Sequence, residues 1–284
     1  MAEIRALKFE ELQLLVDWAG KEGWNPGLND VDSFWNLDPE GFLALCENDK
    51  FIGGGAIIRH SDDYGFMGLF IVDEPFRGRK LGTKLWLARR DQLLSRLKPG
   101  GTIGLDGVDA MVKFYEKGGF QQYTRHRRFQ LNEPSPECKR SETVCDLKTV
   151  NFETVLEFDR RCFPASRPQP LSNWIHQPGA ISLAVVENET LKGFGVMRPC
   201  RVGWKIGPLF ADSLHTADQL FQAFQLQQAG QQIFLDIPDN NPQAIELCRK
   251  YQMEEVFGCE RMYLGSPPKL DNESIFGITN LETG

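Results

Sequence analysis

The sequence predicts an α+β fold built from two tandem copies of one domain, and three observations support this prediction. Short stretches of the N-terminal half recur in the C-terminal half at a nearly constant offset. Within the first half, strand-like and helix-like segments follow one another in an order that the second half repeats more loosely. The length of 284 residues leaves room for two domains of ordinary size.

The internal repeat consists of four short matches that keep their order along the chain. Three of them share an offset of 140 residues, and the last has an offset of 130, so the second copy is about ten residues shorter at that point. The matches are Leu7-Lys8 with Leu147-Lys148, Glu47-Asn48 with Glu187-Asn188, Gly53 and Gly55 with Gly193 and Gly195, and Leu105-Asp106 with Leu235-Asp236. We therefore predict domains at residues 1–131 and 143–265, a polar, proline-containing linker at 132–142, and a C-terminal tail at 266–284.

Each predicted element of the first copy follows from its local pattern. Residues 9–21 carry apolar side chains at helical spacing, whereas apolar runs bounded by Asn-Asp and Asp-Asp pairs are typical of strands joined by tight turns. The predicted order is a strand at 3–8, helices at 9–21 and 30–37, strands at 42–46, 51–59 and 64–72, a helix at 82–97, a strand at 102–105, a helix at 109–118 and closing strands within 119–131. In the second copy we expect helices near 151–161, 213–229 and 240–251, and a loosely ordered tail in which residues 275–277 are able to dock.

Composition and charge argue against several classes of protein. With 41% hydrophobic and 25% charged residues the chain can form a packed core, and its net charge of −7 argues against nucleic acid as a partner. The N-terminus does not resemble a signal peptide, and no apolar run approaches the roughly 20 residues of a membrane span. The seven cysteines are scattered away from the four histidines, so we expect free thiols and no metal site. These features predict a cytoplasmic protein without a membrane partner, and they leave its oligomeric state open.

A basic segment at residues 76–83, FRGRKLGT, lies between a predicted strand and a predicted helix. The N-terminus of a helix carries unpaired N–H groups and a partial positive charge, and glycines let an anion approach the backbone closely. Gly78 and Gly82 bracket this turn, and Arg77, Arg79 and Lys80 add positive charge. The segment is therefore either a diphosphate-binding loop or a solvated basic turn that ends in a glycine.

Two motifs in this half resemble those of the GCN5-related N-acetyltransferases, the GNAT superfamily. Residues 77–82 resemble the acyl-CoA signature Arg/Gln-x-x-Gly-x-Gly/Ala, with Lys80 in place of the middle glycine, and residues 114–120, FYEKGGF, resemble the end of the last helix of the family. The resemblance implies a mixed, mainly antiparallel sheet flanked by helices in each domain, with acetyl-CoA bound as a co-substrate in the first. The cofactor-binding residues that it implies are Phe70, Ile71, Val72, Arg77, Gly78, Arg79, Lys80, Leu81, Gly82 and Thr83.

The segment GWNPG at residues 23–27 is similar to a bacterial and animal subgroup of these enzymes that carries a second, degenerate acetyltransferase-like domain. The second half supports this similarity with GWKIGPLFA at 203–211 and LDIP at 235–238. At the start of the next helix, Asp212 stands where the first copy has glycine and cations, and it would repel a phosphate. We therefore expect that the second domain keeps the fold without binding the cofactor, and that it either shapes the acceptor pocket or only packs against the first domain.

Acetyl transfer from a thioester to an amine requires a neutral amine, stabilisation of an oxyanion and protonation of the leaving thiolate. The resemblance implies that the strand ending at Val72 offers backbone groups to the pantetheine arm and the thioester carbonyl. Tyr115 is the candidate acid, because a phenol with an ordinary pKa of about 10 stays protonated at neutral pH. Asp106, which ends a strand, is the candidate base, although its counterpart Asp236 in the second copy favours a structural role; Asp73 and Glu74, which follow the cofactor strand, are the alternatives.

Trp24, Asn25 and Trp35 lie where the first two helices of the family wall the acceptor side. They are candidates to line a pocket for the acceptor, and they also fit the protein core. The predicted function is an acetyl-CoA-dependent N-acetyltransferase that acts on a primary amine of a small molecule or peptide by direct attack in a ternary complex. The alternative is a non-catalytic acyl-CoA-binding sensor or scaffold with the same fold, and transfer of a longer acyl group also fits the sequence.

Overall fold

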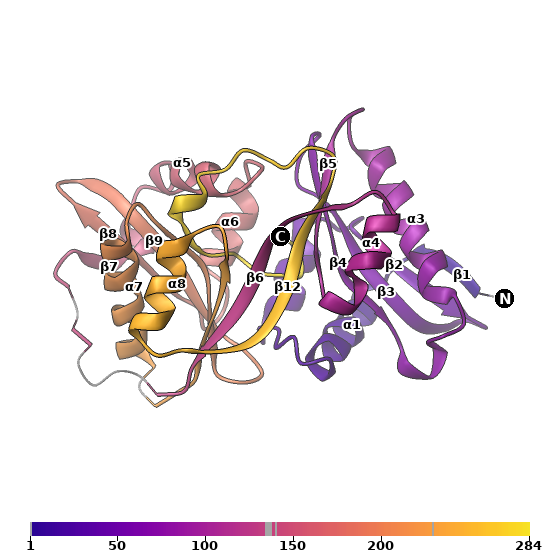
Figure 1. Cartoon of the computed structure of the whole chain (residues 1–284), viewed down its shortest axis with the longest axis horizontal. Helices are drawn as coiled ribbons and strands as arrows, with labels where there is room; N and C mark the ends of the chain where they lie inside the picture. Colours follow the sequence, from indigo (N-terminus) through magenta and orange to yellow (C-terminus); the bar gives the residue numbers. More distant parts are fainter. Residues whose placement is uncertain (1, 134–137, 140, 229) are drawn as a thin grey trace.

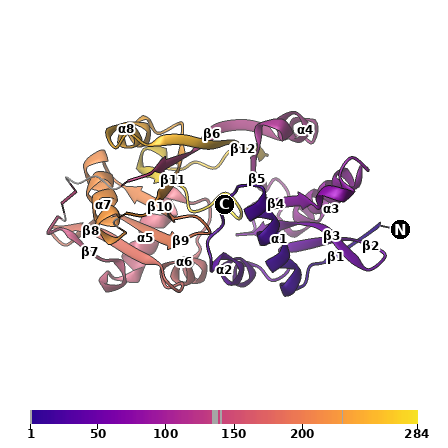
Figure 2. The ribbon, with the colours of Figure 1, turned by 90° about the horizontal axis from the view of Figure 1, so that it is seen from below.

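The computed structural model describes residues 2–133, 138–139, 141–228 and 230–284, so the expected linker lies partly outside the described residues. Within the described residues, thirteen strands form one continuous, mainly antiparallel sheet, and helices cover it (Figure 1, Figure 2). The N-terminal half of the chain forms one end of this sheet and the C-terminal half forms the other. None of the helices in this part of the chain is both long and apolar enough to cross a membrane.

The first half contains the elements that the sequence predicts, with small shifts at their ends. Its strands are β1 (Ala2–Ala6), β2 (Phe42–Glu47), β3 (Lys50–Arg59), β4 (Tyr64–Val72), β5 (Thr102–Gly107) and β6 (Gln121–Leu131). Its helices are α1 (Phe9–Lys21), α2 (Asp30–Leu37), α3 (Leu81–Arg96) and α4 (Val112–Lys117), with short 3₁₀ turns at Glu74–Phe76 and Asp109–Met111. The prediction of more than one closing strand within 119–131 is wrong, because the additional strand comes from the other half of the chain.

The second half repeats this order of elements. Its strands are β7 (Val144–Asp146), β8 (Ile181–Glu187), β9 (Thr190–Pro199), β10 (Trp204–Ala211), β11 (Ile233–Pro238), β12 (Glu254–Leu264) and β13 (Ile275–Gly277). Its helices are α5 (Phe152–Cys162), α6 (Pro168–Ile175), α7 (Leu214–Gln227) and α8 (Pro242–Lys250), with 3₁₀ turns at Leu147–Thr149 and Asn272–Ser274. The three helices expected in this half are confirmed, and α6 takes the place that α2 has in the first half.

The turns that join β2 to β3 and β8 to β9 show how closely the two halves correspond. Asn48 and Asp49 have φ angles of 52° and 62°, and Asn188 and Glu189 have φ angles of 50° and 61°. Two consecutive residues with positive φ are typical of a type I′ turn, whose twist matches that of the strands it joins. Asn adopts this backbone more readily than most residues. The Glu-Asn match found in the sequence therefore marks the same hairpin in both halves.

The two halves exchange their last strands. The strands follow the order β1-β2-β3-β4-β5-β12-β6-β11-β10-β9-β8-β7, with β13 beside β10. β12 of the second half pairs with β5 of the first, and β6 of the first half pairs with β11 of the second. β6 and β12 also pair with each other at the centre of the sheet, where Figure 1 shows them side by side. Each half therefore needs a strand from the other to complete its part of the sheet.

Successive side chains along a strand point to opposite faces of the sheet, and both faces are buried. In β2, Phe42, Ala44 and Cys46 belong to the core beneath α1 and α2, while Leu43 and Leu45 belong to the core beneath α3. The core beneath α1 and α2 continues into the second half beneath α5 and α6, and α2 contacts α6. The cores beneath α3 and beneath α7 are separate from each other. The two halves therefore share a hydrophobic core on one face of the sheet.

From Ser274 onwards most of the C-terminal tail is buried, which differs from the loosely ordered tail expected from the sequence, whereas the docking of residues 275–277 that the sequence allowed is confirmed. β13 pairs with β10, and both views place the C-terminus at the centre of the molecule (Figure 1, Figure 2). Asn280, Glu282 and Thr283 are each at most 3% exposed. The tail was expected to be loose because it is polar, but Oδ1 of Asn280 accepts hydrogen bonds from the N–H groups of residues 282 and 283, and the carbonyl oxygen of Thr283 lies 2.8 Å from Nε2 of His60. The end of the chain packs against Gly68 of β4, in the first half.

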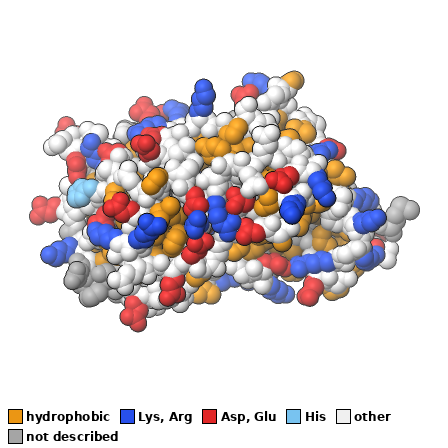
Figure 3. Space-filling model, in the orientation of Figure 1, with side chains coloured by type: hydrophobic (Ala, Val, Ile, Leu, Met, Phe, Trp, Pro, Cys, Tyr) orange, Lys and Arg blue, Asp and Glu red, His pale blue; other side chains and the backbone are white. Residues whose placement is uncertain are grey.

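Acidic and basic side chains are interspersed on the face of the molecule seen in Figure 3. Several ion pairs join the two halves: Arg127 in β6, for example, contacts both Asp239 and Glu255. Because such pairs neutralise one another locally, this face presents no broad surface of one sign among the described residues.

Candidate functional site

The sheet opens between β4 and β5. In the described residues these parallel strands pair only as far as Met67 and Leu105. A bulge in β4 begins just beyond that point, where Leu69 and Phe70 together stand opposite Gly55 and Leu69 has a φ of 48°. A bulge of this kind bends its strand and leaves a residue unpaired. The backbones of β4 and β5 therefore diverge, and each presents an edge to the space between them.

A cavity of about 430 Å³ occupies this opening and extends to the start of α3. Its wall includes the bulged part of β4, the turn before α3, the end of β5 and α4. Residues from distant segments complete it, namely Glu22 and Trp24, Phe257 and Cys259 of β12, and Leu281 and Glu282 near the C-terminus. Both halves of the chain therefore contribute to one cavity.

The N-terminus of α3 lies at the cavity without a capping side chain. The N-cap residue Lys80 makes no side-chain hydrogen bond to the helix, and its φ of 60° is left-handed, at the position where the acyl-CoA signature has a glycine. Gly82 lines the cavity, and a Cβ there would make only ordinary contacts, at 3.6 Å from Phe70 and 3.7 Å from Val72. Packing within the protein thus does not require this glycine. The positive end of α3 and its first N–H groups are available to an anion.

The ten residues predicted to bind the cofactor fall into two groups. Six of them line the cavity, namely Phe70, Ile71, Val72, Arg77, Gly78 and Gly82. The other four, Arg79, Lys80, Leu81 and Thr83, are not among the described residues that line it. Arg79 instead pairs with Glu47, 2.7 Å away. Arg77 donates from Nε to the carbonyl oxygen of Val72 at 2.8 Å and contacts Glu22 through Nη2, so it ties the turn to the end of β4.

Tyr115 lines the cavity from α4. Its ring packs against Trp86 and Phe120, and Gly107 of β5 makes room for it, since a Cβ there would lie 2.8 Å from the ring. Burial raises the pKa of Tyr115 to about 12, although Arg89 acts in the opposite direction. The phenol is therefore protonated throughout the neutral range and can donate its proton.

Asp106 also borders the cavity, but its carboxylate is already engaged. Nε and Nη2 of Arg261, in β12, donate to its two oxygens at 2.8 and 2.7 Å, and Nδ1 of His126 lies 3.1 Å from Oδ1. Burial by itself would raise the pKa of Asp106, but Arg261 and His126 outweigh burial and lower it to about 2. Because such a carboxylate is a poor proton acceptor, its surroundings argue against the predicted role as a base. They favour a structural role, in which Asp106 holds β12 against β5.

Of the three residues predicted on the acceptor side, the structure brings one to the cavity. Trp24 lines it. Asn25 instead exchanges two hydrogen bonds with the backbone of Val202, at 2.9 and 3.0 Å, and so fastens its loop to the second half. Trp35 is half-buried and packs against the core, where its ring stacks on Phe42. The sequence could not separate these positions, because a cavity wall and a core are both apolar surroundings.

Arg89 is a residue of the site that the sequence pattern did not identify. Its guanidinium is buried beside the bulge, where Nη2 donates to the carbonyl oxygens of Ala56 and Gly68, each at 2.6 Å. Among the residues that the structure describes, no acidic side chain forms an ion pair with Arg89. Burial lowers the pKa of Arg89 to about 10. The run of glycines at 53–55 was the available signal, because a Cβ on Gly55 would lie 2.5 Å from this guanidinium.

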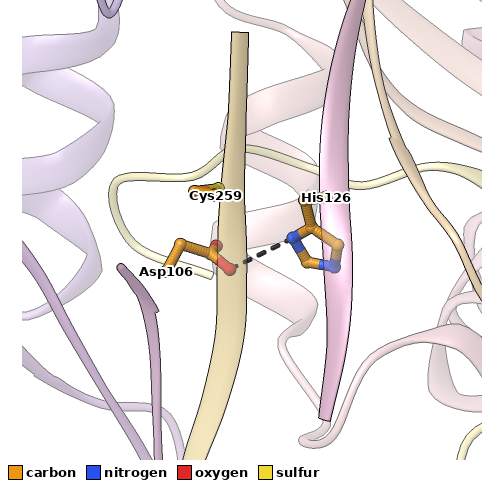
Figure 4. A group of neighbouring side chains, drawn as sticks. All are labelled: Asp106, His126 and Cys259. Atoms are coloured by element: carbon orange, nitrogen blue, oxygen red, sulfur yellow. Dashed lines mark ion pairs between the residues drawn. The ribbon is translucent and has the colours of Figure 1, made fainter. Parts of the chain in front are cut away.

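Asp106, His126 and Cys259 lie close together between β5, β6 and β12, with their potential ligand atoms within 4.8 Å of one another (Figure 4). Side chains of these three types are common metal ligands. Here, however, Arg261 holds both oxygens of Asp106, and burial raises the pKa of the Cys259 thiol well above its usual range. A cation at this point would have to displace a guanidinium and compete for a thiol proton. The chemistry of the cluster therefore does not favour a metal site.

The corresponding opening in the second half is filled by the protein itself. β10 and β11 pair as far as Ile206, and β13 then lies beside β10, with the N–H of Ile278 donating to the carbonyl oxygen of Asp236 at 2.9 Å. Helix α7, which corresponds to α3, begins after Ser213, whose hydroxyl accepts a hydrogen bond from the N–H of Thr216 at 3.2 Å. The second half thus closes the strand edge and caps the helix end that the first half leaves available.

The first half therefore combines an anion-binding helix end, an open strand edge and a protonated phenol around one cavity. A helix end with free N–H groups binds phosphate, and a strand edge binds the polar groups of an extended chain. A phenol that remains protonated can transfer a proton to a leaving group. These capacities together fit group transfer from a phosphate-bearing donor to a second substrate.

Comparisons with known proteins found two family models that match parts of this sequence and several solved structures that match its fold. The profile of the Acetyltransferase (GNAT) family matches residues 7–120, and that of an Acetyltransferase (GNAT) domain matches residues 155–277. The holothin acyltransferase of a Pseudoalteromonas strain is 28% identical over 97% of this chain and 92% of its own length. A structure of a candidate acetyltransferase from Pyrococcus horikoshii has a TM-score of 0.84 and 27% identity, and the match covers 100% of this chain and 96% of that one. A tandem GNAT protein of the clavulanic acid biosynthesis pathway has the same fold, with a TM-score of 0.66 and 11% identity over 94% of this chain and 99% of its own.

Proposed function

Because the chain belongs to the GNAT acetyltransferase family and contains two GNAT domains, we propose that its first domain is an acetyl-CoA-dependent N-acetyltransferase. The acceptor is a primary amine of a small molecule or peptide, and it attacks the thioester directly while both substrates are bound. One observation carries this proposal: the uncapped N-terminus of α3 and the ring of Tyr115 border the same cavity, whereas β13 fills the corresponding opening in the second half.

The first domain divides the binding of acetyl-CoA among three structural features. The first N–H groups of α3, together with Gly78, Gly82 and the guanidinium of Arg77, hold the diphosphate. The bulged residues 69–72 present backbone groups to the pantetheine arm, as an open strand edge does for an extended ligand. Arg89 supports this edge, because its hydrogen bonds to the carbonyl oxygens of Ala56 in β3 and Gly68 in β4 fix the pair of residues next to the bulge.

Tyr115 supplies the proton for the leaving thiolate. Its ring is held rigidly by Trp86 and Phe120, and its raised pKa keeps the hydroxyl protonated at every pH at which the enzyme is expected to work. A proton donor that is already held in position loses little entropy when it reaches the transition state. Asp106 contributes by position only, since it fastens β12 beside the cavity through Arg261.

A panel of primary amines offered with acetyl-CoA, with release of free thiol as the readout, tests this function. Turnover of at least one amine, together with its loss in Tyr115→Phe, supports the proposal. Binding of acetyl-CoA without turnover of any amine would indicate the sensor or scaffold instead. A protein that does not bind acetyl-CoA at all would refute both.

The length of the transferred acyl group is tested by the same assay. The relative from Pseudoalteromonas is named as an acyltransferase, without restriction to the acetyl group. We therefore extend the panel to propionyl- and butyryl-CoA. A preference for one of these thioesters would revise the donor, while the reaction would still be acyl transfer to an amine.

A further inference from the structure

The end of the chain crosses from the second half to the cavity of the first. Beyond β13, Oδ1 of Asn280 accepts hydrogen bonds from the N–H groups of Glu282 and Thr283, at 2.9 and 2.7 Å, and thereby fixes a tight turn. The carbonyl oxygen of Thr283 lies 2.8 Å from Nε2 of His60, in the first half. The turn packs so closely on Gly68 that a Cβ there would overlap the carbonyl oxygen of Glu282. The C-terminal segment is thus held where β4 and β5 diverge.

This turn places Glu282 in the wall of the cavity. The residue is 2% exposed, and its Oε2 accepts a hydrogen bond from the N–H of Leu281 at 3.1 Å. Among the residues that the structure describes, Oε1 has no hydrogen-bond partner. A buried carboxylate oxygen without a donor is costly, and proteins rarely keep one without a reason. Its place in the cavity wall indicates that the missing donor belongs to a ligand.

The charged groups that act electrostatically on Glu282 are engaged with other partners. They are Lys205 from β10, Arg128 from β6, Arg198 from β9 and Asp30 from α2. The two arginines form bidentate ion pairs with aspartates, and the lysine donates to the carbonyl oxygens of residues 24 and 25. Burial raises the pKa of Glu282; the lysine and the arginines oppose this shift, and the aspartate adds to it. The carboxylate therefore lies in a polar region in which no described side chain pairs with it directly.

We infer that Glu282 binds the ammonium group of the acceptor and accepts a proton from it, so that the C-terminal tail supplies a catalytic residue to the first domain. This inference rests on the amine acetylation proposed above. The other acidic residues in the cavity wall have partners, since Asp106 is held by Arg261 and Glu22 contacts Arg77. Glu282 is the acid in that wall whose free oxygen is available for a cationic acceptor.

The proton balance of the reaction is complete with these groups. The Glu282 carboxylate takes one proton from the ammonium group and leaves a neutral amine with a free lone pair. The nitrogen forms the C–N bond to the thioester carbon, the C–S bond breaks, and Tyr115 protonates the departing thiolate. A second proton from the nitrogen restores Tyr115, and Glu282 releases its proton to solvent. The products are an amide, a free thiol and one proton.

The variant Glu282→Gln keeps the shape of the side chain and removes the proton acceptor. We expect kcat/KM for an alkylamine to fall about 100-fold or more, while calorimetry shows unchanged affinity for acetyl-CoA. Glu273→Gln is the matched control, because Glu273 is exposed in the same C-terminal region, and it should retain full activity. If Glu282→Gln fails to fold, Glu282→Asp serves as the second variant: it keeps the charge at a shorter reach, and its rate should fall while its pH profile retains the shape of the parent profile.

An acceptor that is uncharged at neutral pH separates proton transfer from packing. An alkoxyamine does not need to lose a proton before it attacks, so Glu282→Gln should acetylate it nearly as fast as the parent does. The rate of the same variant with an alkylamine should rise with pH, as the free amine becomes more abundant. An equal loss with both acceptors, or no loss with either, would overturn the inference. A parent protein that acetylates no amine would refute the proposed function itself, and the inference with it.

The stability of Glu282→Gln distinguishes a catalytic role of this carboxylate from a structural one, because the two roles predict opposite changes in the unfolding midpoint. Because the pKa of Glu282 is raised on folding, the folded state binds more protons than the unfolded state, and this carboxylate costs stability as the pH rises above its unfolded pKa. Glu282→Gln should therefore raise the unfolding midpoint near neutral pH, with a gain that shrinks as the pH falls towards about 4. A lower midpoint at neutral pH would show that a protein group holds the carboxylate, and would overturn the inference.

Discussion

Asp30 and Arg198 form a fully buried ion pair that joins the two halves of the chain. Nε of Arg198, in β9, donates to Oδ1 of Asp30 at 2.8 Å, and its Nη2 donates to Oδ2 at 3.1 Å. Neither side chain has any exposed surface. Oδ2 of Asp30 also accepts from the N–H of Gly27 at 2.7 Å, so the pair orders the loop that brings Trp24 to the cavity. A contact between the halves thus supports the wall of the site.

Asp30→Ala is expected to lower the free energy of unfolding by about 3–5 kcal/mol, because it leaves the Arg198 guanidinium buried without a partner. Chemical denaturation measures this change. Asp32→Ala is the control, since Asp32 is exposed in the same turn of α2 and its loss should cost less than about 1 kcal/mol. If Asp30→Ala lowered the free energy of unfolding as little as Asp32→Ala does, water would have to reach Arg198 in solution.

Negative charge at the start of α3 should weaken the binding of coenzyme A. For Arg77→Glu and for Gly82→Asp we expect the dissociation constant to rise at least tenfold, or about 1.4 kcal/mol, because a carboxylate would face the diphosphate. Isothermal titration calorimetry measures this constant. Arg59→Glu makes the same change in net charge as Arg77→Glu, on an exposed residue, and Asp212→Asn alters the corresponding helix start of the second half. Both should bind coenzyme A like the parent, and unchanged binding by the two α3 variants would place the diphosphate elsewhere.

Tyr115→Phe should lower kcat about 100-fold or more and leave the affinity for acetyl-CoA nearly unchanged, because it removes one hydroxyl group and keeps the packing of the ring. Steady-state kinetics and calorimetry separate the two effects. Tyr123→Phe, at an exposed tyrosine of β6, is the control and should retain the activity of the parent. With the pKa of Tyr115 near 12, kcat of the parent should not decline on the alkaline side up to about pH 10. Full activity of Tyr115→Phe would assign the protonation of the thiolate to another group.

Asp106 should stabilise the protein in a manner that depends on pH. Its pKa is about 2 in the folded protein, against about 3.9 for an unfolded aspartate. The unfolded state therefore binds more protons between these values, and the stabilisation is present above about pH 4 and is lost as the pH falls towards 2. Asp106→Asn should lower the free energy of unfolding by on the order of 2 kcal/mol near neutral pH, with a difference that shrinks in acid. Denaturation at a series of pH values checks this, and a difference independent of pH would trace the loss to packing.

Most elements of the fold could be predicted, because they depend on patterns within a few residues of one another. Leu12, Leu15, Val16 and Ala19 are all buried beneath α1, as their spacing predicts. The Glu-Asn pairs that revealed the repeat form the same turn twice. Gly78 and Gly82 reach the cavity because they follow a strand and begin a helix, which is a local relationship.

The partners of the strands could not be predicted in the same way. The sequence of β6 indicates a strand, but an alternating pattern does not say which neighbour the strand will have. The exchange of β6 and β12 depends on pairings such as Asp106 with Arg261, which are 155 residues apart. For the same reason, the sequence could not show that the carboxylate of Asp106 is occupied by a guanidinium from the other half.

By itself, the sequence determined the family, the two related domains, the basic turn before α3 and the tyrosine on α4, because each of these follows from residues that are neighbours along the chain. Only the tertiary structure decided that the second opening is filled by β13, that Arg89 supports the bulge, and that Glu282 reaches the cavity from the C-terminus. A polar tail has the same composition whether it is solvated or buried. Its position depends on the long-range pairing of β13 with β10, which no local pattern encodes.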